Sequence, residues 1–134
     1  MSNRLFDFGR EGILDESIGM NTGDIRVMLV RSSYSFSNGH KFLADLGVVD
    51  NGRSASLTGK TFTAGVFDAD DTTLNAVMAV SCNALLFFQH TGSDATARVI
   101  AYIDTPTTGL PFTPSPGQAV SIEHFNGTNR IFRL

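Results

Sequence analysis

The sequence predicts an all-β fold with one or two short helices, in which antiparallel strands form a two-sheet sandwich of the jelly-roll type. Short stretches of alternating apolar and polar residues recur along most of the chain, and turn-forming residues separate them. The aromatic residues are eleven Phe and two Tyr with no Trp, and Thr, Ser, Gly, Asn and Ala are frequent. This composition suits strands and tight turns. Seven to nine short strands are expected, and eight of them in two packed sheets would make a jelly roll.

The chain is expected to form one β-sandwich domain over residues 1–134, with an N-terminal helical or arm segment at about residues 1–16. A domain of this length buries roughly two thirds of the surface that its unfolded chain exposes. It therefore needs neither a disulfide nor a metal ion in order to fold. The sequence contains no internal repeat, no low-complexity segment and no evident linker.

The N-terminal segment has the periodicity of an amphipathic helix. The residues that share one helical face are Leu5, Phe8, Gly9, Gly12 and Ile13. Ser2 or Asn3 is expected to cap the start of this helix. The two glycines each weaken a helix by roughly 1 kcal/mol relative to Ala, so we expect another element to pack closely against them. The alternative is a partly extended segment that orders only on contact with a partner.

Alternation of apolar residues predicts a strand at about residues 25–31, which follows a turn at residues 21–24 and belongs to a hairpin. A short helix is expected next. Ser37 or Asn38 would cap its start, and Gly47 would end it.

Residues 50–52 read Asp-Asn-Gly, which predicts a strong turn. Further strands are expected at residues 61–66 and 74–80, on either side of an acidic turn at residues 68–71. Residues 84–88 are continuously apolar, which indicates a central strand covered on both faces.

The C-terminal third begins with a strand at residues 99–103. A loop with four prolines follows at residues 106–116, where the hydrogen bonds of a strand ladder cannot be sustained. Val120 and Ile122 are then expected to pair with Ile131 across an Asn-Gly turn.

Charge and patterning exclude several functional classes. The net charge is −3 and no Lys/Arg cluster occurs, so direct contact with nucleic acid is not expected. The N-terminus lacks the apolar core of a signal peptide, and no apolar run approaches the about 20 residues of a membrane-spanning helix. We therefore expect a chain that is made in the cytoplasm and does not enter a membrane. The lone Cys82 excludes an intrachain disulfide framework.

No catalytic, cofactor-binding or metal-binding residues are predicted. His40 and His124 lack another His, Cys or carboxylate at the i+2 or i+4 spacing of a typical metal pair, and His90 has only Asp94 at i+4, which alone does not make a metal site. Cys82 has no evident base partner. The carboxylates at residues 68–71 lack the Gly and the Glu that an EF-hand loop requires, so a solvated turn is expected there. These observations favour a protein that is not an enzyme.

Sequence motifs extend over almost the whole chain. They are GREGILDESI at residues 9–18, DIRVMLVR at 24–31, Phe36 with HKFLADL at 40–46, IAYID at 100–104, GLPFTP at 109–114 and NRIFRL at 129–134. Together they resemble a family of small structural proteins of tailed-phage virions.

The resemblance implies a head cement or decoration protein with a jelly-roll fold, which sits between capsomers on the outer surface of the capsid. Its partners would be the phage major capsid protein and further copies of itself, as a dimer or trimer at capsid symmetry axes. It would be made in the host bacterial cytoplasm, and the resemblance brings no catalytic residue or cofactor. One alternative is a tail, collar or baseplate component. Another is a carbohydrate-binding adhesin module, which would need exposed aromatic residues.

The residues expected to contact the capsid are apolar and lie in two segments. They are Leu5, Phe6 and Phe8 near the N-terminus, and Leu110 and Phe112 at the tip of the proline-containing loop. The alternative is that these side chains close the protein's own core.

Overall fold

The computed structural model describes residues 4–103, 113–122 and 131–133. The elements within these ranges are β1 (Arg4–Leu5), α1 (Asp7–Leu14), β2 (Ile25–Arg31), η1 (Leu43–Leu46), β3 (Asp50–Arg53), η2 (Thr63–Gly65), β4 (Val66–Phe67), β5 (Thr72–Asn75), β6 (Cys82–Gln89), β7 (Val99–Ile103), β8 (Ala119–Ile122) and β9 (Phe132–Arg133), where η marks a 3-10 helix. The described part of the chain is thus mostly strands with one α-helix, as the all-β prediction requires.

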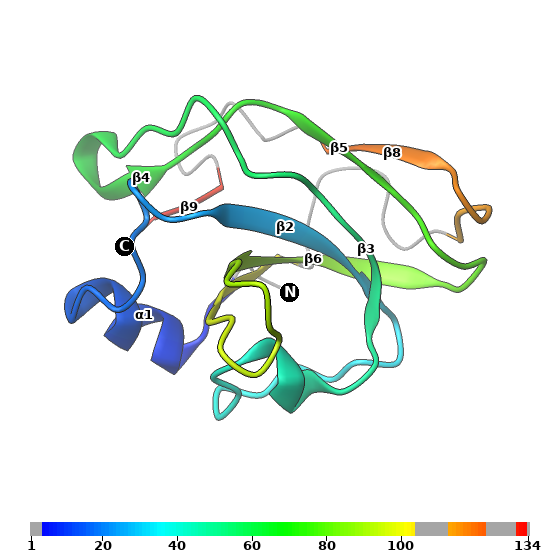
Figure 1. Cartoon of the computed structure of the whole chain (residues 1–134), viewed down its shortest axis with the longest axis horizontal. Helices are drawn as coiled ribbons and strands as arrows, with labels where there is room; N and C mark the ends of the chain where they lie inside the picture. The colour runs from blue at the N-terminus through cyan, green and yellow to red at the C-terminus, as the bar shows by residue number, and fades with distance from the viewer. Residues whose placement is uncertain (1–3, 104–112, 123–130, 134) are drawn as a thin grey trace.

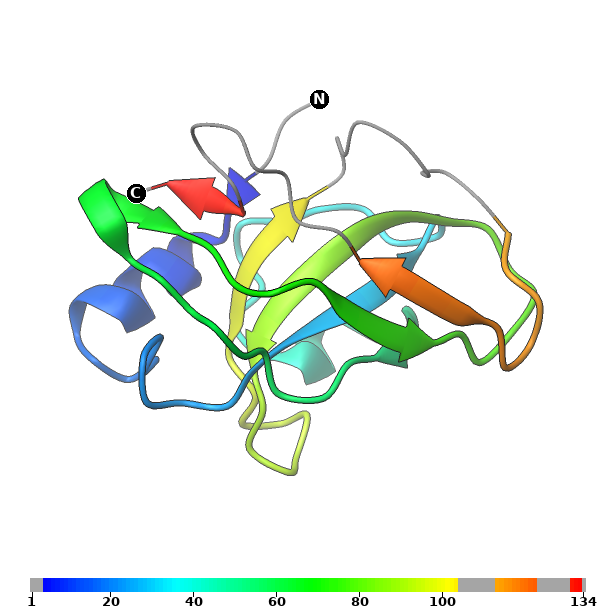
Figure 2. The same ribbon diagram turned by 90° about the horizontal axis from the view of Figure 1, so that it is seen from above.

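The strands form one large antiparallel sheet and two small strand pairs (Figure 1). The large sheet has five strands in the order β1-β7-β6-β2-β3, and the pairs are β4-β9 and β5-β8. Seen from above, the two pairs lie along one side of the large sheet (Figure 2). The longest ladder joins β2 to β6, with Val27 opposite Phe87.

The five-stranded sheet is buried on both faces. On one face Val27 and Phe87 share a core cluster with Leu74 of β5. On the other face Met28 and Phe88 belong to a second cluster, which η1 helps to cover. A fully buried side chain of this kind contributes roughly 1.5–3 kcal/mol to stability. The prediction of a central strand at residues 84–88 is confirmed, since β6 lies in the middle of the sheet.

The N-terminal helix is present, but it begins later than expected. It starts at Asp7 with Phe6 as its N-cap residue, so the expectation that Ser2 or Asn3 caps it is wrong. Leu5 precedes the helix and belongs to β1, where it lies opposite Ala101 of β7 in the large sheet. The close packing expected at the glycines is confirmed. A Cβ at Gly9 would collide with the backbone of β7.

The largest departures from the predicted elements lie from residue 21 onward to residue 80. The element before the turn at residues 21–24 is α1 and not a strand, so β2 forms no hairpin across this turn and pairs with β6 and β3. Residues 50–52 belong to β3 and make no turn. Residues 61–66 mostly form a bridge and the short η2, in which Ala64 has a φ of 55°. The strand expected at residues 74–80 ends at Asn75.

The helix expected after Ser37 or Asn38 is a single 3-10 turn. It begins at Leu43 with Phe42 as its N-cap residue, so neither expected cap is used. The carboxylate of Asp45 accepts hydrogen bonds from the backbone N–H of Phe42. The stop at Gly47 is confirmed, and its φ of 79° favours glycine.

The C-terminal strands pair with partners far away in the sequence. β8 pairs with β5, placing Val120 opposite Leu74, and β9 pairs with β4. The predicted pairing of Val120 and Ile122 with Ile131 is therefore wrong. Ile131 is buried, and its N–H bonds the carbonyl of Phe67. Most of the expected proline-containing loop lies outside the described residues.

Candidate interaction surface

The residues expected to contact the capsid divide into three groups. Leu5 and Phe6 are buried, with Phe6 0% exposed, so they fill the protein's own core and present no free surface. Phe8 is half-buried, and the ammonium of Lys41 lies 5.4 Å from the centre of its ring. Leu110 and Phe112 lie outside the described residues. The burial favours the core interpretation for Leu5 and Phe6, and the interface must be sought elsewhere.

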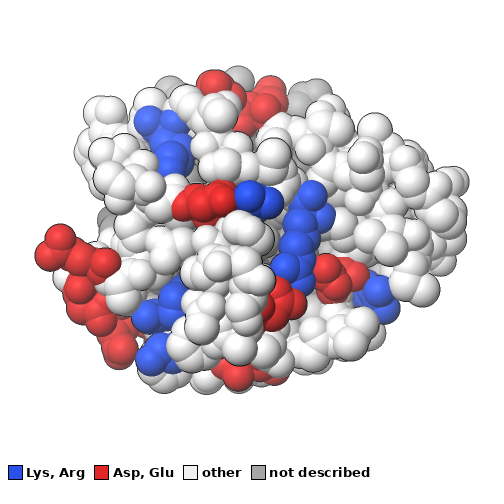
Figure 3. Space-filling model, in the orientation of Figure 1, with Lys and Arg blue, Asp and Glu red and all other residues white. Residues whose placement is uncertain are grey.

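One end of the molecule is formed by chain that has no charged side chains. Residues 72–89 and 105–122 contain no Asp, Glu, Lys or Arg. The pairing of β5 with β8 brings residues 72–75 beside residues 119–122. In the space-filling view the end at the right, where Figure 1 places β5 and β8, is without charged groups (Figure 3).

Two loops at this end are hydrogen-bonded to each other. The N–H of Ala76 donates to the carbonyl of Gln118 at 2.8 Å, and the N–H of Gly117 donates to the carbonyl of Ala76 at 2.8 Å. We call the surface formed by residues 76–81 and 113–118 the charge-free end. These backbone bonds give the two loops a defined shape, which lowers the entropic cost of using them as a binding surface.

A buried asparagine holds the first of these loops. Asn51 is fully buried, and its Oδ1 accepts hydrogen bonds from the N–H groups of Val77 at 3.1 Å and Met78 at 2.7 Å. Its Nδ2 donates to the carbonyl of Met78 at 3.0 Å and to Sγ of Cys82 at 3.2 Å. The composition of residues 50–52 predicted a turn because Asn and Gly are typical turn residues. Here Asn51 instead supplies loop contacts, and Gly52 permits the close approach of the Asn75 backbone.

The anchored loop presents apolar side chains to solvent. Val77 is 61% exposed and Met78 is 43% exposed. The guanidinium of Arg31 lies beside Met78, with its Nη2 3.1 Å from Sδ, and its Nε donates to the carbonyl of Asp50 at 3.0 Å. Two residues before Asp50, Val48 is 78% exposed. Exposed apolar side chains of this size on hydrogen-bonded loops are typical of protein contact sites.

The opposite end of the molecule, at α1, has a different character (Figure 1). Leu14, the last residue of α1, is 83% exposed. Residues 7–16 carry four carboxylates and one guanidinium, a net charge of −3, which equals the net charge of the whole chain. The acidic groups gather over α1 at the left of Figure 3. The molecule thus has one negative end and one charge-free end.

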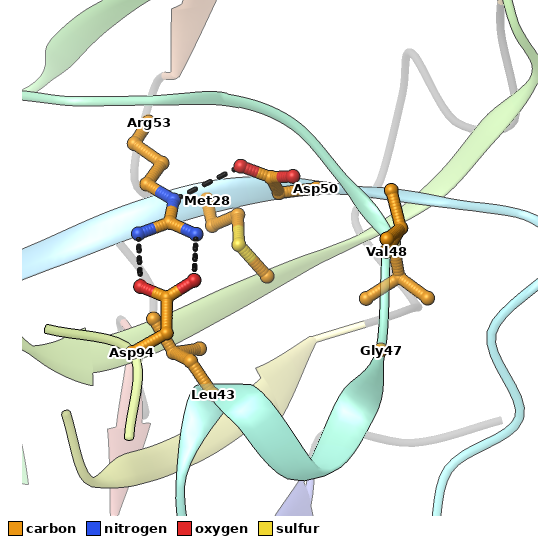
Figure 4. Close-up of a pocket in the computed structure, with 8 residues that line it drawn as sticks. Met28, Leu43, Gly47, Val48, Asp50, Arg53 and Asp94 are labelled. Carbon is orange, nitrogen blue, oxygen red and sulfur yellow. Dashed lines mark hydrogen bonds and ion pairs between the residues drawn. The ribbon is translucent and has the colours of Figure 1, made fainter. Parts of the chain in front are cut away.

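A shallow cavity of about 110 Å³ lies beside β3 and η1 (Figure 4). Met28 and Leu43 contribute its apolar lining, and Asp50, Arg53 and Asp94 its charged rim. Arg53 donates to both carboxylate oxygens of Asp94 at 2.8 Å and to Asp50 at 3.0 Å. These bonds hold the pKa of Asp94 below its ordinary value. The three charged groups are paired with one another. Their bonds connect β3 to the β6-β7 loop, so their role is better understood as structural than as reactive.

The side chains of His40 and Cys82 have structural partners, and His90 is held through its backbone. Nδ1 of His40 lies 2.8 Å from the hydroxyl of Tyr34, and burial raises the pKa of Tyr34 to about 12. The backbone N–H of His90 donates to the carbonyl of Asp24, and His124 lies outside the described residues. Burial raises the pKa of the Cys82 thiol, which disfavours its nucleophilic thiolate form. In the described ranges no three His, Cys, Asp or Glu side chains gather in a way that would hold a metal ion.

The chain was compared with protein-family models, curated proteins and solved structures. No family model, no curated protein and no solved structure matches it. Within the described residues, no helix is both long enough and apolar enough to cross a membrane.

Sequence reasoning missed the exposed residues Leu14, Val48, Val77 and Met78, because an apolar residue in a strand or helix pattern is expected to be buried. A signal was nevertheless present. Two stretches without charge, at residues 72–89 and 105–122, are long for a chain in which 17% of the residues are charged.

Proposed function

We propose that this chain is a structural protein of a tailed-phage virion, and that it acts as a head cement protein that clamps adjacent major capsid protein subunits. The sequence motifs that resemble this family are the first support. The proposal includes a closed two-sheet sandwich of the jelly-roll type, in which the pairs β4-β9 and β5-β8 belong to the second layer opposite the five-stranded sheet.

The observation that carries the proposal is the presence of exposed apolar side chains at two separate ends of the molecule. Leu14 lies at the end of α1, and Val77 and Met78 lie on the charge-free end. A clamp needs two contact surfaces joined by a body that does not deform. The five-stranded sheet, covered on both faces, provides that body.

Clamping stabilises a shell by mass action and by multivalency. A protein that binds the assembled lattice and not the free coat protein shifts the equilibrium toward the lattice. When each copy holds more than one neighbour, several contacts must break together before two capsomers separate. The α1 end, with its net charge of −3, suits a coat surface of positive potential.

The test is co-sedimentation of the purified chain with expanded heads that lack it. The wild type is expected to bind the heads. Leu14→Asp should weaken binding at least about tenfold, because it places a charge in an apolar contact worth roughly 1.5 kcal/mol or more. Ala95→Asp is the matched control, since Ala95 is exposed on the β6-β7 loop, away from both ends, and the change adds the same charge.

Three results would contradict the proposal. They are no binding to heads, binding that Leu14→Asp and Ala95→Asp weaken equally, and binding to isolated tails instead of heads. The last result would favour a tail, collar or baseplate component.

A further inference from the structure

We propose that the charge-free end binds a second copy of this chain, so that two copies associate through residues 76–81 and 113–118 with their α1 ends pointing outward. This inference rests on the proposed function only in taking the charge-free end as one of the two contact surfaces described above. It assigns the partner that binds this surface.

The distribution of charge selects this partner. Two copies of a negatively charged chain repel each other, and the net charge of −3 is carried by residues 7–16 at the α1 end. Contact through the charge-free end places these segments as far apart as the molecule allows. Contact through α1 would bring like charges together, which disfavours association.

The chemistry of the surface also fits a copy of itself. An isologous contact places the same patch on both sides, so the patch must be complementary to itself. Residues 76–81 and 113–118 meet this condition because none of them carries a charge, and the neighbouring guanidinium of Arg31 already bonds the carbonyl of Asp50 and Sδ of Met78. Val77 and Met78 would then bury their exposed surface against the same apolar residues of the partner copy.

The surface is ordered before it binds. Asn51 fixes the backbone of Val77 and Met78 through hydrogen bonds of 3.1 and 2.7 Å. Gly117 and Gln118 are tied to Ala76 at 2.8 Å. Association therefore costs little loop entropy, and the energy of burying the apolar side chains appears as affinity.

Sedimentation equilibrium of the full chain tests the inference. The wild type is expected to reach twice its mass of 14.4 kDa as its concentration rises. The dissociation constant should change less than about threefold between about 0.05 M and about 0.5 M salt. Screening acts on charges, and residues 76–81 and 113–118 have none; the charged group placed at the edge of the contact is Arg31, whose guanidinium lies beside Met78.

Variants locate the interface. Val77→Asp should weaken the dimer at least about tenfold, whereas Leu14→Asp and Ala95→Asp should leave its dissociation constant within about twofold of the wild-type value. If Val77→Asp loses the circular dichroism spectrum of the wild type, Val77→Ser takes its place, because it removes the apolar contact without adding charge.

Each other outcome overturns the inference. These are a wild type that stays monomeric, a trimer or larger assembly, and a dimer to which Val77→Asp and Ala95→Asp do equal damage. Failure here is distinct from failure of the proposed function. A monomer that still binds heads leaves the cement role standing, and a dimer that binds no heads removes the cement role alone.

Discussion

The side-chain oxygen of Asn51 accepts a hydrogen bond of 2.7 Å from the backbone N–H of Met78, twenty-seven residues further along the chain. Through this bond a polar residue in the protein core fixes the backbone conformation of an exposed apolar loop. Asn51 itself is fully buried. A substitution of Asn51 in the core should therefore change the conformation of the exposed loop at Val77 and Met78.

Replacement of Asn51 by Ala is expected to destabilise the protein by about 3 kcal/mol, because two backbone N–H groups and one carbonyl lose their partner and a cavity replaces a fully buried side chain. Urea unfolding measures the loss. Asn38→Ala, at an exposed position, should change stability by less than about 0.5 kcal/mol. Equal stability of the two variants would show that the loop is held by other means.

Gly9→Ala should destabilise the protein even though Ala is the better helix former. Helix propensity favours Ala by about 1 kcal/mol, but a Cβ at this position would collide with the carbonyl of Ile100. We expect a net loss of about 1–3 kcal/mol. The matched control is Gly39→Ala, whose Cβ would lie 3.7 Å from the Ser37 hydroxyl and meet no obstacle. A stabilised Gly9→Ala variant would mean that α1 does not rest on β7.

Phe6→Ala separates a core role from an interface role for the N-terminal segment. Phe6 is fully buried, so its truncation should lower the free energy of unfolding by about 3–5 kcal/mol. Phe8→Ala should cost clearly less, since Phe8 is only half-buried. If thermal unfolding shows the two variants to be equally stable, Phe6 is not part of the core.

The contribution of Asp94 to stability should disappear in acid. Its pKa lies below the ordinary value of 3.8 because Arg53 donates hydrogen bonds to the carboxylate. A carboxyl group with a lowered pKa in the folded state stabilises the protein above the pKa of the unfolded chain, and this stabilisation is lost as the pH falls through the folded pKa. Asp94→Asn should therefore be less stable than the wild type near neutral pH, by about 1 kcal/mol or less, because the pair is partly exposed to solvent.

Urea unfolding of both proteins from about pH 7 down to about pH 2.5 checks this dependence. The difference between the wild type and Asp94→Asn should be constant above about pH 5 and shrink below the ordinary pKa. A difference that is unchanged in acid would exclude the ion pair as its cause.

The sequence predicts well those elements that depend on a local property of their own residues, such as a continuous apolar character or a glycine at positive φ. The strands at residues 84–88 and 99–103 are apolar over their whole length, and the strand at residues 25–31 is apolar except at Arg26 and Arg31; β6, β7 and β2 correspond to them. Gly47 ended its helix as expected, since a glycine at positive φ is a local requirement.

Prediction failed where distant segments decide the outcome. Residues 50–52 have turn composition, but β2 takes them into the sheet and Asn51 becomes a buried anchor. The pairing of β5 with β8 joins residues more than forty positions apart, and no local pattern specifies such a partner. The exposed position of Val77 likewise depends on where β5 stops, which the alternation of apolar residues did not reveal.

The copy number and position of the chain in purified virions test the central proposal most directly. Gel densitometry together with cryo-electron microscopy should give copies on the order of hundreds, on the outer surface of the head, because a shell lattice repeats each of its contacts by symmetry. Finding the chain in only tens of copies or fewer at the tail or neck, or finding no copy in the particle, would contradict the cement role.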